Sequence, residues 1–286
     1  MGEGITELQH ALRLTAFLAV FALMAAWEAS APRRRASFSR GQRWPHNLAL
    51  LAIDVIALRL LAPGAAIAVA VAGETQGWGF LQAVDLPAWV ELLIAIAMLD
   101  LAIYFQHVLF HAVPVLWRLH RVHHADPDFD VTTGTRFHPL EILLSVVIKC
   151  IVVGALGASA VAVLVFEVLL NATAMFNHAN ARLPAGVDGY LRWLVVTPDM
   201  HRVHHSIIHR ETDSNFGFNL PWWDRLFGTY RAQPEAGHLA MKIGTEGVGG
   251  PQALRIGRLL TQPFSIAPAS DSVSISSLHR SNGKVI

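Results

Sequence analysis

The sequence is poor in cysteine and in charged residues. Cys150 is the single cysteine among 286 residues, so the chain can form no intrachain disulfide and no thiolate cluster for a metal. Charged residues make up only 15% of the chain, and the formal net charge is +1. Because nucleic-acid-binding domains carry a strong basic excess, this composition argues against a nucleic-acid partner.

Several common cofactor motifs are also missing. The sequence contains no Gly-x-Gly-x-x-Gly for a dinucleotide, no Cys-x-x-Cys-His for haem attachment, and no His-Glu-x-x-His for a zinc protease. A chain without these motifs has no evident electron carrier of its own. We therefore expect that any redox chemistry would draw electrons from a separate protein.

What the sequence has in abundance is long apolar runs, and hydrophobic residues make up 53% of it. A helix that crosses a bilayer needs about 20 mostly apolar residues. The last of the runs is too long for one span, and Gly154 and Gly157 near its middle predict a turn between two helices. The sequence thus predicts an all-α, polytopic membrane bundle of four or five apolar helices. The runs are Leu12–Trp27, Leu48–Ala72, Ala88–Gln106 and Leu140–Phe176.

The loops between these runs predict an orientation. The first loop region carries five arginines, whereas the second, Gly73–Pro87, carries no lysine or arginine. By the positive-inside rule the first loop is cytoplasmic and the third span returns the chain to the cytoplasm at His107. The N-terminal run lacks a basic segment before it, so we expect a retained anchor rather than a signal peptide. The five arginines are Arg33, Arg34, Arg35, Arg40 and Arg43.

Histidines are concentrated in one part of the chain. The pentapeptide His-Arg-Val-His-His occurs twice, at His120–His124 and His201–His205, and His107 and His111 form a further pair. Residues at i, i+3 and i+4 share one face of a helix, and imidazole is the commonest protein ligand for transition metals. This pattern predicts a histidine-rich metal centre on the cytoplasmic side, because the runs deliver every cluster to that side.

Some ionisable residues lie inside the apolar runs. Pairing between helices is the favoured interpretation, for example of Arg59 with Asp54, Glu91 or Asp100. Asp100 has a second interpretation, because it lies two helical turns before His107 and could orient that ligand. Asp126, Asp128 and Asp130, which follow the first pentapeptide, are expected to be solvated loop residues. Lys149 and Glu167 are the other ionisable residues that lie inside the apolar runs.

The ordered histidine pattern resembles the fatty acid hydroxylase / sterol desaturase superfamily of integral-membrane, non-haem di-iron enzymes. Besides the histidine boxes, Asp100 with Tyr104, the segment Arg136–Glu141 and the run Trp222–Tyr230 resemble family segments. The resemblance implies a catalytic region at 97–235, after membrane anchor helices at 1–96 and before a C-terminal extension at 236–286. The extension is serine-rich from Thr261 onward, and we expect it to be partly disordered there.

The resemblance also implies a ligand set. Some family members carry a histidine where this chain has Ala174, so one iron has fewer imidazoles here unless His138 compensates. Asp100, Asp199 and Asp213 are expected to hydrogen-bond to ligands and orient them. The implied iron ligands are His107, His111, His120, His123, His124, His178, His201, His204 and His205, with His138 as a further candidate.

The implied reaction is O2-dependent hydroxylation or desaturation of a C–H bond in a lipid, such as a fatty acyl chain or a sterol. Two iron ions would supply the oxidising power, since side chains alone cannot break such a bond. An external donor, a reductase with a ferredoxin or cytochrome type of carrier, would supply the electrons. The expected location is an integral membrane, the inner membrane if the source is bacterial.

Two other classes fit parts of the pattern. A zinc-dependent membrane hydrolase would use histidines but needs a base beside the metal, and nine histidines exceed what one zinc binds. A metal transporter or sensor would place histidines and carboxylates near the middle of the spans. The histidines here lie beyond the predicted span ends, so the oxygenase interpretation is favoured.

Overall fold

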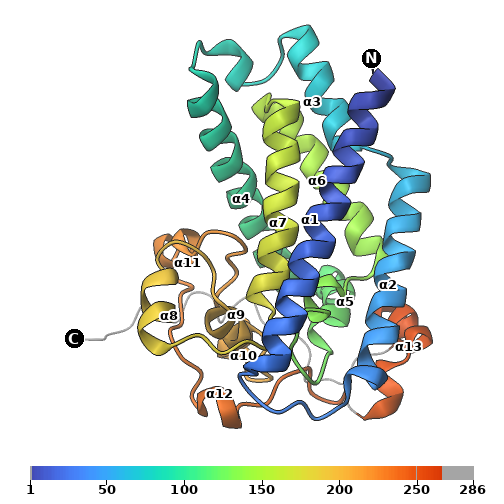
Figure 1. Ribbon diagram of the computed structural model, residues 1–286, viewed down its shortest axis with the longest axis vertical. Coiled ribbons are helices and arrows are strands. Elements are labelled where there is room, and N and C mark those ends of the chain that lie inside the picture. Colours follow the sequence, from blue (N-terminus) through green and yellow to red (C-terminus); the bar gives the residue numbers. More distant parts are fainter. Residues whose placement is uncertain (1, 249, 266–286) are drawn as a thin grey trace.

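The computed structural model describes residues 2–248 and 250–265 (Figure 1). Over these ranges the chain is helical, with two isolated β-bridges and no strand. Short 3-10 helices lie at Leu81–Ala83, Thr133–Thr135, Pro251–Leu254 and Gln262–Phe264. The α-helices are α1 (Gly2–Ser30), α2 (Arg40–Leu61), α3 (Ala65–Gln76), α4 (Ala88–Ala112), α5 (Pro114–His124), α6 (Pro139–Leu156), α7 (Ala160–Asn177), α8 (Ala185–Leu191), α9 (Pro198–His204), α10 (His209–Thr212), α11 (Trp222–Leu226), α12 (Gly237–Ala240) and α13 (Ile256–Thr261).

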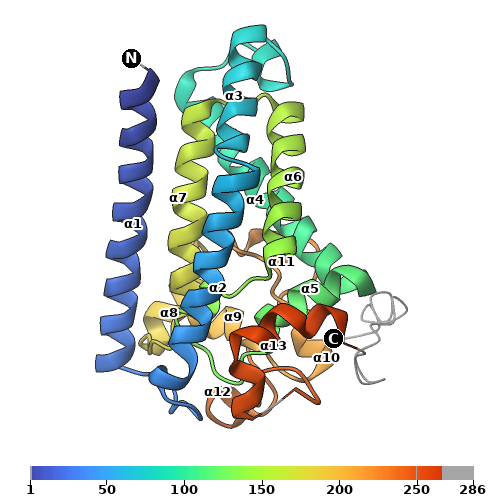
Figure 2. The same cartoon turned by 90° about the vertical axis from the view of Figure 1, so that its right-hand side faces the viewer.

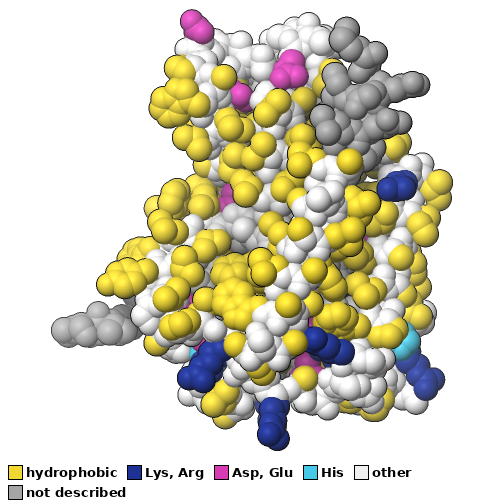
Figure 3. Space-filling model, viewed as in Figure 1, with side chains coloured by type: hydrophobic (Ala, Val, Ile, Leu, Met, Phe, Trp, Pro, Cys, Tyr) yellow, Lys and Arg dark blue, Asp and Glu magenta, His cyan; other side chains and the backbone are white. Residues whose placement is uncertain are grey.

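Five segments are long and apolar enough to cross a membrane. They run side by side in both ribbon views, and much of their outer surface is apolar (Figures 1, 2 and 3). This arrangement confirms the predicted all-α bundle and defines an integral membrane protein. The segments are Ala11–Ser30, Arg40–Ala83, Ala88–Ala112, Pro139–Leu156 and Ala160–Asn177.

The second apolar run is broken in the middle, which the sequence analysis did not predict. Helix α2 ends at Leu61 and α3 begins at Ala65, with Pro63 and Gly64 between them. Proline lacks the N–H that continues a helix, and Gly64 has the left-handed φ of 63°. The expected single helix over Leu48–Ala72 is therefore two helices.

The last apolar run is a hairpin, as predicted. Helix α6 ends at Leu156 with Gly157 as its C-cap, whose φ of 68° is left-handed, and the side chain of Ser159 caps α7. A Cβ atom on Gly157 would lie 2.7 Å from the carbonyl oxygen of Trp78. Only glycine allows this approach, which packs the turn against the segment after α3.

The charges within the spans pair differently from the examples expected. Lys149 Nζ lies 2.9 Å from Glu167 Oε1, and Arg13 pairs with the same carboxylate from α1. Glu91 instead accepts hydrogen bonds from the backbone and hydroxyl of Ser159. Arg59 is exposed and makes no ion pair with Asp54, Glu91 or Asp100, so those suggested pairs were wrong. Pairing between helices nevertheless occurs, at Glu167.

The shorter helices form a cap at one end of the bundle. Helices α5 and α8 to α12 gather where α1, α4 and α7 end and where α2 begins (Figure 1). Lysine and arginine side chains gather at this lower end of the molecule (Figure 3). All the predicted histidine boxes reach this end, because α4 and α7 run in the same direction.

The C-terminal extension begins as ordered structure. Thr261 ends α13, and Gln262–Phe264 forms a 3-10 helix whose Gln262 carbonyl accepts a hydrogen bond from Arg121 at 3.1 Å. The expectation of disorder from Thr261 was therefore wrong for Thr261–Ser265. The part of that expectation that concerns residues 266–286 lies outside the described residues.

Candidate metal centre

Four elements carry nine buried histidines to one place under the bundle. The C-terminal end of α4 supplies two, α5 supplies three, the residue after α7 supplies one, and α9 with its C-cap supplies three. Each nitrogen-bearing ring is at most 4% exposed, which is unusual for histidine and requires a partner for its nitrogens. The nine are His107, His111, His120, His123, His124, His178, His201, His204 and His205.

The nine histidines fall into two groups. Within each group one ring nitrogen of every member lies within 4.8 Å of the others. The groups adjoin, since the stacked rings of His124 and His205, one from each group, have centroids 4.5 Å apart. We name them the five-histidine group, His107, His111, His120, His124 and His204, and the four-histidine group, His123, His178, His201 and His205.

The two copies of the pentapeptide divide their histidines between the two groups in opposite ways, which is an exchanged use of the repeat. In the first copy, His120 and His124 enter the five-histidine group while His123 enters the other group. In the second copy the first and last histidines, His201 and His205, enter the four-histidine group while His204 crosses over. Residues at i and i+4 stay together on a helix face, whereas i+3 points to the neighbouring group. Each copy therefore connects the two groups.

The difference in size between the groups arises on α7. The five-histidine group is completed by His107 and His111, an i, i+4 pair at the end of α4. The corresponding pair at the end of α7 would be residues 174 and 178, but position 174 is alanine. The four-histidine group therefore has His178 alone from α7.

The hydrogen bonds of the rings show that these sites suit a cation. His178 Nδ1 lies 2.7 Å from the Ala174 carbonyl and His123 Nδ1 lies 3.2 Å from the Arg136 carbonyl, so both nitrogens must donate. The other nitrogens, the two Nε2 atoms, then carry lone pairs and face each other at 3.1 Å. Two acceptors so close repel each other unless a cation lies beside them.

The five-histidine group has the same character. His107 Nδ1 and His204 Nδ1 each lie 2.8 Å from a backbone carbonyl, of Phe216 and Ser214 respectively. Their Nε2 atoms, and that of His120, are buried without a hydrogen-bond partner among the described residues. Burial also lowers the pKa of His120 here, and of His178 in the four-histidine group, to about 3, so both rings are neutral at physiological pH. Neutral imidazoles with free Nε2 atoms are metal ligands ready to bind.

Two carboxylates hydrogen-bond to histidines of the five-histidine group. Glu141 Oε1 lies 2.6 Å from His120 Nδ1, and Asp213 Oδ1 lies 3.3 Å from His111 Nδ1. Asp213 was among the residues expected to orient ligands, but Glu141 was not. The signal for Glu141 was an acidic residue in the first turn of a mostly apolar helix, two residues after Pro139.

Asp100 and Asp199, the other two aspartates expected to orient ligands, contact segments next to the histidines instead. Asp100 accepts hydrogen bonds from Asn219 N, Leu220 N and Trp223 Nε1 and touches no ligand histidine. It thereby helps to fix the segment that presents the Phe216 carbonyl to the metal centre. Asp199 instead pairs with Arg202, inside the second pentapeptide, and with Arg33 at 2.9 Å.

His138 lies outside both histidine groups. Its Nδ1 accepts a hydrogen bond from Leu140 N at 3.2 Å, which caps α6, so its Nε2 carries the proton and donates to the Leu260 carbonyl at 3.2 Å. Neither nitrogen has a free lone pair for a metal. We therefore leave His138 out of the candidate ligands, and it does not compensate for Ala174.

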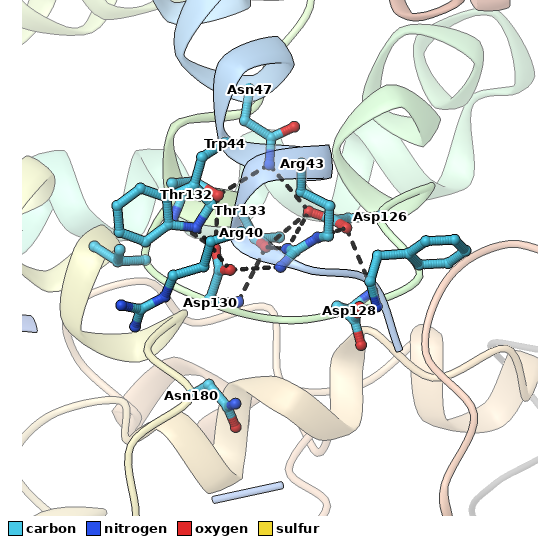
Figure 4. Close-up of polar contacts among 12 residues, drawn as sticks. Arg40, Arg43, Trp44, Asn47, Asp126, Asp128, Asp130, Thr132, Thr133 and Asn180 are labelled. Atoms are coloured by element: carbon cyan, nitrogen blue, oxygen red, sulfur yellow. Dashed lines mark hydrogen bonds and ion pairs between the residues drawn. The ribbon is translucent and has the colours of Figure 1, made fainter. Parts of the chain in front are cut away.

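The aspartates after the first pentapeptide are buried, so the expectation of a solvated loop was wrong. Arg43 donates to Asp126 at 2.7 and 2.8 Å and to Asp130 at 2.5 Å, and Asn47 and Trp44 add further bonds (Figure 4). Burial raises the pKa of Asp126, but Arg43 and Arg136 outweigh it and lower that pKa to about 2. This network attaches α2 to the segment that follows α5.

These features define a class of protein: an integral membrane protein with two adjoining, buried groups of histidines at one end of its spans, each of which could hold a metal ion. Residues 92–229 match the family model described as fatty acid hydroxylase, and the match contains all nine histidines. The chain belongs to the fatty acid hydroxylase / sterol desaturase superfamily, as the resemblance of its motifs predicted. No solved structure matches the chain.

Curated relatives carry the same region within longer chains. An ornithine lipid hydroxylase from Rhizobium tropici is 28% identical over 63% of this chain and 52% of its own length. An alkylglycerol monooxygenase from Xenopus tropicalis is 28% identical over 58% of this chain and 37% of its own. A cholesterol 25-hydroxylase from Rattus norvegicus is 25% identical over 52% and 49%. The chain thus spans about half of these relatives or less, and all three are named for lipid oxidation.

Proposed function

We propose that this protein is a membrane-bound di-iron oxygenase that hydroxylates, or desaturates, a C–H bond of a lipid with O2. The observation that carries the proposal is the pair of adjoining histidine groups, of five and four members, buried at the end of the apolar spans. Two iron ions bound there would supply the oxidising power to break an unactivated C–H bond. The three relatives, each named for the oxidation of a lipid, support the substrate class.

The protein's own contribution is to hold and orient the ligands and to exclude water. Nine histidines would bind the two ions, and backbone carbonyls together with Glu141 and Asp213 fix the ring tautomers so that Nε2 faces inward. Burial keeps the centre dry, which protects reactive species from bulk water. A lipid tail would reach the centre from the bilayer, because the ligands lie at the span ends.

The proposal extends to partners and location. An external donor of the reductase and ferredoxin or cytochrome type would supply two electrons per turnover. The cap would face the cytoplasm, at the inner membrane if the source is bacterial, since the first loop carries the arginines. Residues 97–235 would form the catalytic region, with anchor helices at 1–96 and an extension at 236–286.

The alternatives explain less of the geometry. One catalytic zinc takes three protein ligands and a structural zinc takes four, which leaves most of the nine histidines without a role. A transporter would hold its ion near the middle of the spans, often with carboxylates. Here the histidines lie at one end of the bundle, and no carboxylate joins either group among the described residues.

The test is oxygen-dependent oxidation of lipids by the purified protein. The protein is loaded anaerobically with ferrous iron and given a chemical reductant, 18O2 and a panel of lipids that includes an ornithine lipid, an alkylglycerol and cholesterol. We expect one lipid class to gain one 18O atom or lose two hydrogens, and the His204→Ala/His205→Ala variant to be inactive. Protein that holds two irons but oxidises no lipid of a full membrane extract would contradict the proposal.

A further inference from the structure

A cavity of about 400 Å³ lies between the ends of the first two spans. Its walls come from the C-terminal end of α1, the loop that follows, the first turn of α2 and the segment around Asp128–Asp130. This volume is within the range of small-ligand pockets. The cavity lies outside both histidine groups, and neither the family match nor the relatives assign it a ligand.

One wall of the cavity is shared with the metal centre. Phe129 lines the cavity, and its ring centroid lies 5.3 Å from that of His178 and 5.0 Å from that of His205. A single aromatic ring therefore separates the cavity from the four-histidine group. A molecule held in the cavity would lie beside the place where oxidation is proposed to occur.

The cavity carries guanidinium groups without strong ion pairs. Arg35 is exposed and has no ion pair among the described residues. Arg40 stacks on Trp44 and reaches Glu28 only at 3.4 Å, and Arg34 donates to the carbonyls of His238 and Met241. In Figure 4 the guanidinium of Arg40 lies outside the hydrogen-bonded network around Arg43. These three cations can each bind an anionic oxygen.

The carboxylates that line the same cavity already have donors. Glu28 accepts hydrogen bonds from Val131 N and Asn180 N, and Asp128 accepts from Ser37 N and Phe38 N, each at 2.6 to 2.9 Å. The third carboxylate, Asp130, is paired with Arg43. The negative charge is thus bound by fixed donors of the protein, whereas the side chains of Arg35 and Arg40 are exposed and that of Arg34 is half-buried.

The position of the cavity relative to the membrane identifies the kind of ligand. The first span ends at Ser30 and the second begins at Arg40, so the cavity lies at the level where a bilayer has its head groups. Directly inside this level the side chains between α1 and α2 are apolar, and the rings of Phe21 and Trp44 meet edge to face with their centroids 5.5 Å apart. An amphiphile with an anionic head and an apolar tail fits both surroundings.

We propose that this cavity binds the anionic group, a phosphate or a carboxylate, in the head of the lipid substrate. The head group contacts Arg34, Arg35 and Arg40, and the tail runs between α1 and α2. Because Phe129 lies between the cavity and the four-histidine group, the head group is held beside the proposed metal centre. That the bound lipid is the substrate rests on the proposed function; that the cavity binds an anionic lipid does not.

The experiment compares binding of dihexanoyl phosphatidic acid, dihexanoylglycerol and inorganic phosphate to the full chain in detergent by titration calorimetry. Arg35→Gln/Arg40→Gln removes two exposed cations without opening the buried network, and Arg258→Gln on α13 is the matched control. We expect phosphatidic acid to bind at least tenfold more tightly than dihexanoylglycerol. We also expect the double variant to lose at least tenfold in that affinity and the control to lose none.

Each other outcome overturns the inference. Equal binding of dihexanoylglycerol would show that the anion is not recognised, and an unchanged affinity in the double variant would place the site elsewhere. Inorganic phosphate that binds as tightly as phosphatidic acid would make this a site for free phosphate rather than for a lipid. The titrations are also carried out with metal-free protein. The lipid-binding result can therefore be interpreted even if the proposed iron chemistry fails.

A kinetic measurement tests the link to the substrate once an oxidised lipid class is identified. The double variant should raise KM for that lipid at least tenfold and leave kcat within about twofold, because the arginines bind the head group and do not touch the reacting carbon. An unchanged KM together with weakened binding of phosphatidic acid would overturn the assignment of the bound lipid as the substrate.

Discussion

At the scale of single residues, Glu141 is placed to orient His120, one of the proposed iron ligands. Its carboxyl group lies 2.6 Å from His120 Nδ1, and when it is ionised it accepts the Nδ1 proton and leaves Nε2 free. We expect Glu141→Ala to weaken iron affinity by about 10- to 100-fold, the usual effect of removing such a partner, and Glu141→Gln to weaken it less. Iron titration monitored by competition with a chelator measures this. Glu235→Gln, which changes an exposed carboxylate, is the control. Equal iron affinity in all variants would contradict the proposed role of Glu141.

The buried histidines also predict how the metal-free protein responds to acid. Burial lowers the pKa of His120 and His178 to about 3, whereas histidines of an unfolded chain titrate near their ordinary pKa of about 6.5. Between these values the unfolded state binds more protons, so folding stability falls as pH drops from 6.5 towards 3. We expect the unfolding midpoint of metal-free protein to fall steadily from pH 7 to pH 5. A midpoint that is flat or rises over this interval would contradict the assigned protonation states.

At the scale of elements, the segment after α10 is held against the metal centre by Asp224. This carboxylate accepts hydrogen bonds from Phe216 N and Gly217 N at 2.7 and 2.8 Å, and the Phe216 carbonyl meets His107. We expect Asp224→Ala to lower the iron content from two towards one per chain, because only the five-histidine group loses support. Metal analysis measures this, with Asp85→Asn in the exposed loop before α4 as control. Loss of both irons, or of neither, would contradict the assignment.

The helices themselves show what sequence patterns can and cannot predict. Apolar run lengths and the Gly157 turn predicted the spans, because hydrophobicity and backbone freedom are local properties. The break at Pro63-Gly64 was missed although its residues are strong helix breakers, since the apolar run continues across it. The burial of Asp126 was missed for another reason. It depends on Arg43, which lies 83 residues away in the sequence, and no local pattern reveals that pair.

The metal centre was predictable in its members but not in its arrangement. The spacing of the boxes predicted that His107, His111 and the histidines of the two pentapeptides gather in one place, and the family resemblance added His178. Which histidine enters which group depends on how α4, α5, α7 and α9 pack, so the exchanged use of the repeat appears only in the structure. His138 was included because it lies in the segment Arg136–Glu141, which resembles a family segment, and could have compensated for Ala174. Its role as a helix cap is visible only through its hydrogen bond with the Leu140 N–H.

At the scale of the whole molecule, the arginines around the first loop predict the orientation of the protein. We expect the Asp85→Cys variant, with its thiol in the loop between the second and third spans, to react with a membrane-impermeant maleimide added to intact cells. The Glu246→Cys variant, with its thiol in the segment after α12, should react only after the membrane is permeabilised. Both variants carry Cys150→Ser. The reverse labelling pattern would place the histidines on the non-cytoplasmic side and contradict the proposed topology.

The central claim is that the two histidine groups are two iron sites, and metal stoichiometry tests it most directly. Protein purified in detergent and loaded anaerobically with ferrous iron should hold about two irons per chain. His107→Ala/His111→Ala removes two ligands from the five-histidine group alone, and His178→Ala/His201→Ala removes two from the four-histidine group alone. Each variant should retain about one iron. The account would be contradicted if the wild-type protein bound one zinc and no iron, and if both variants bound no zinc.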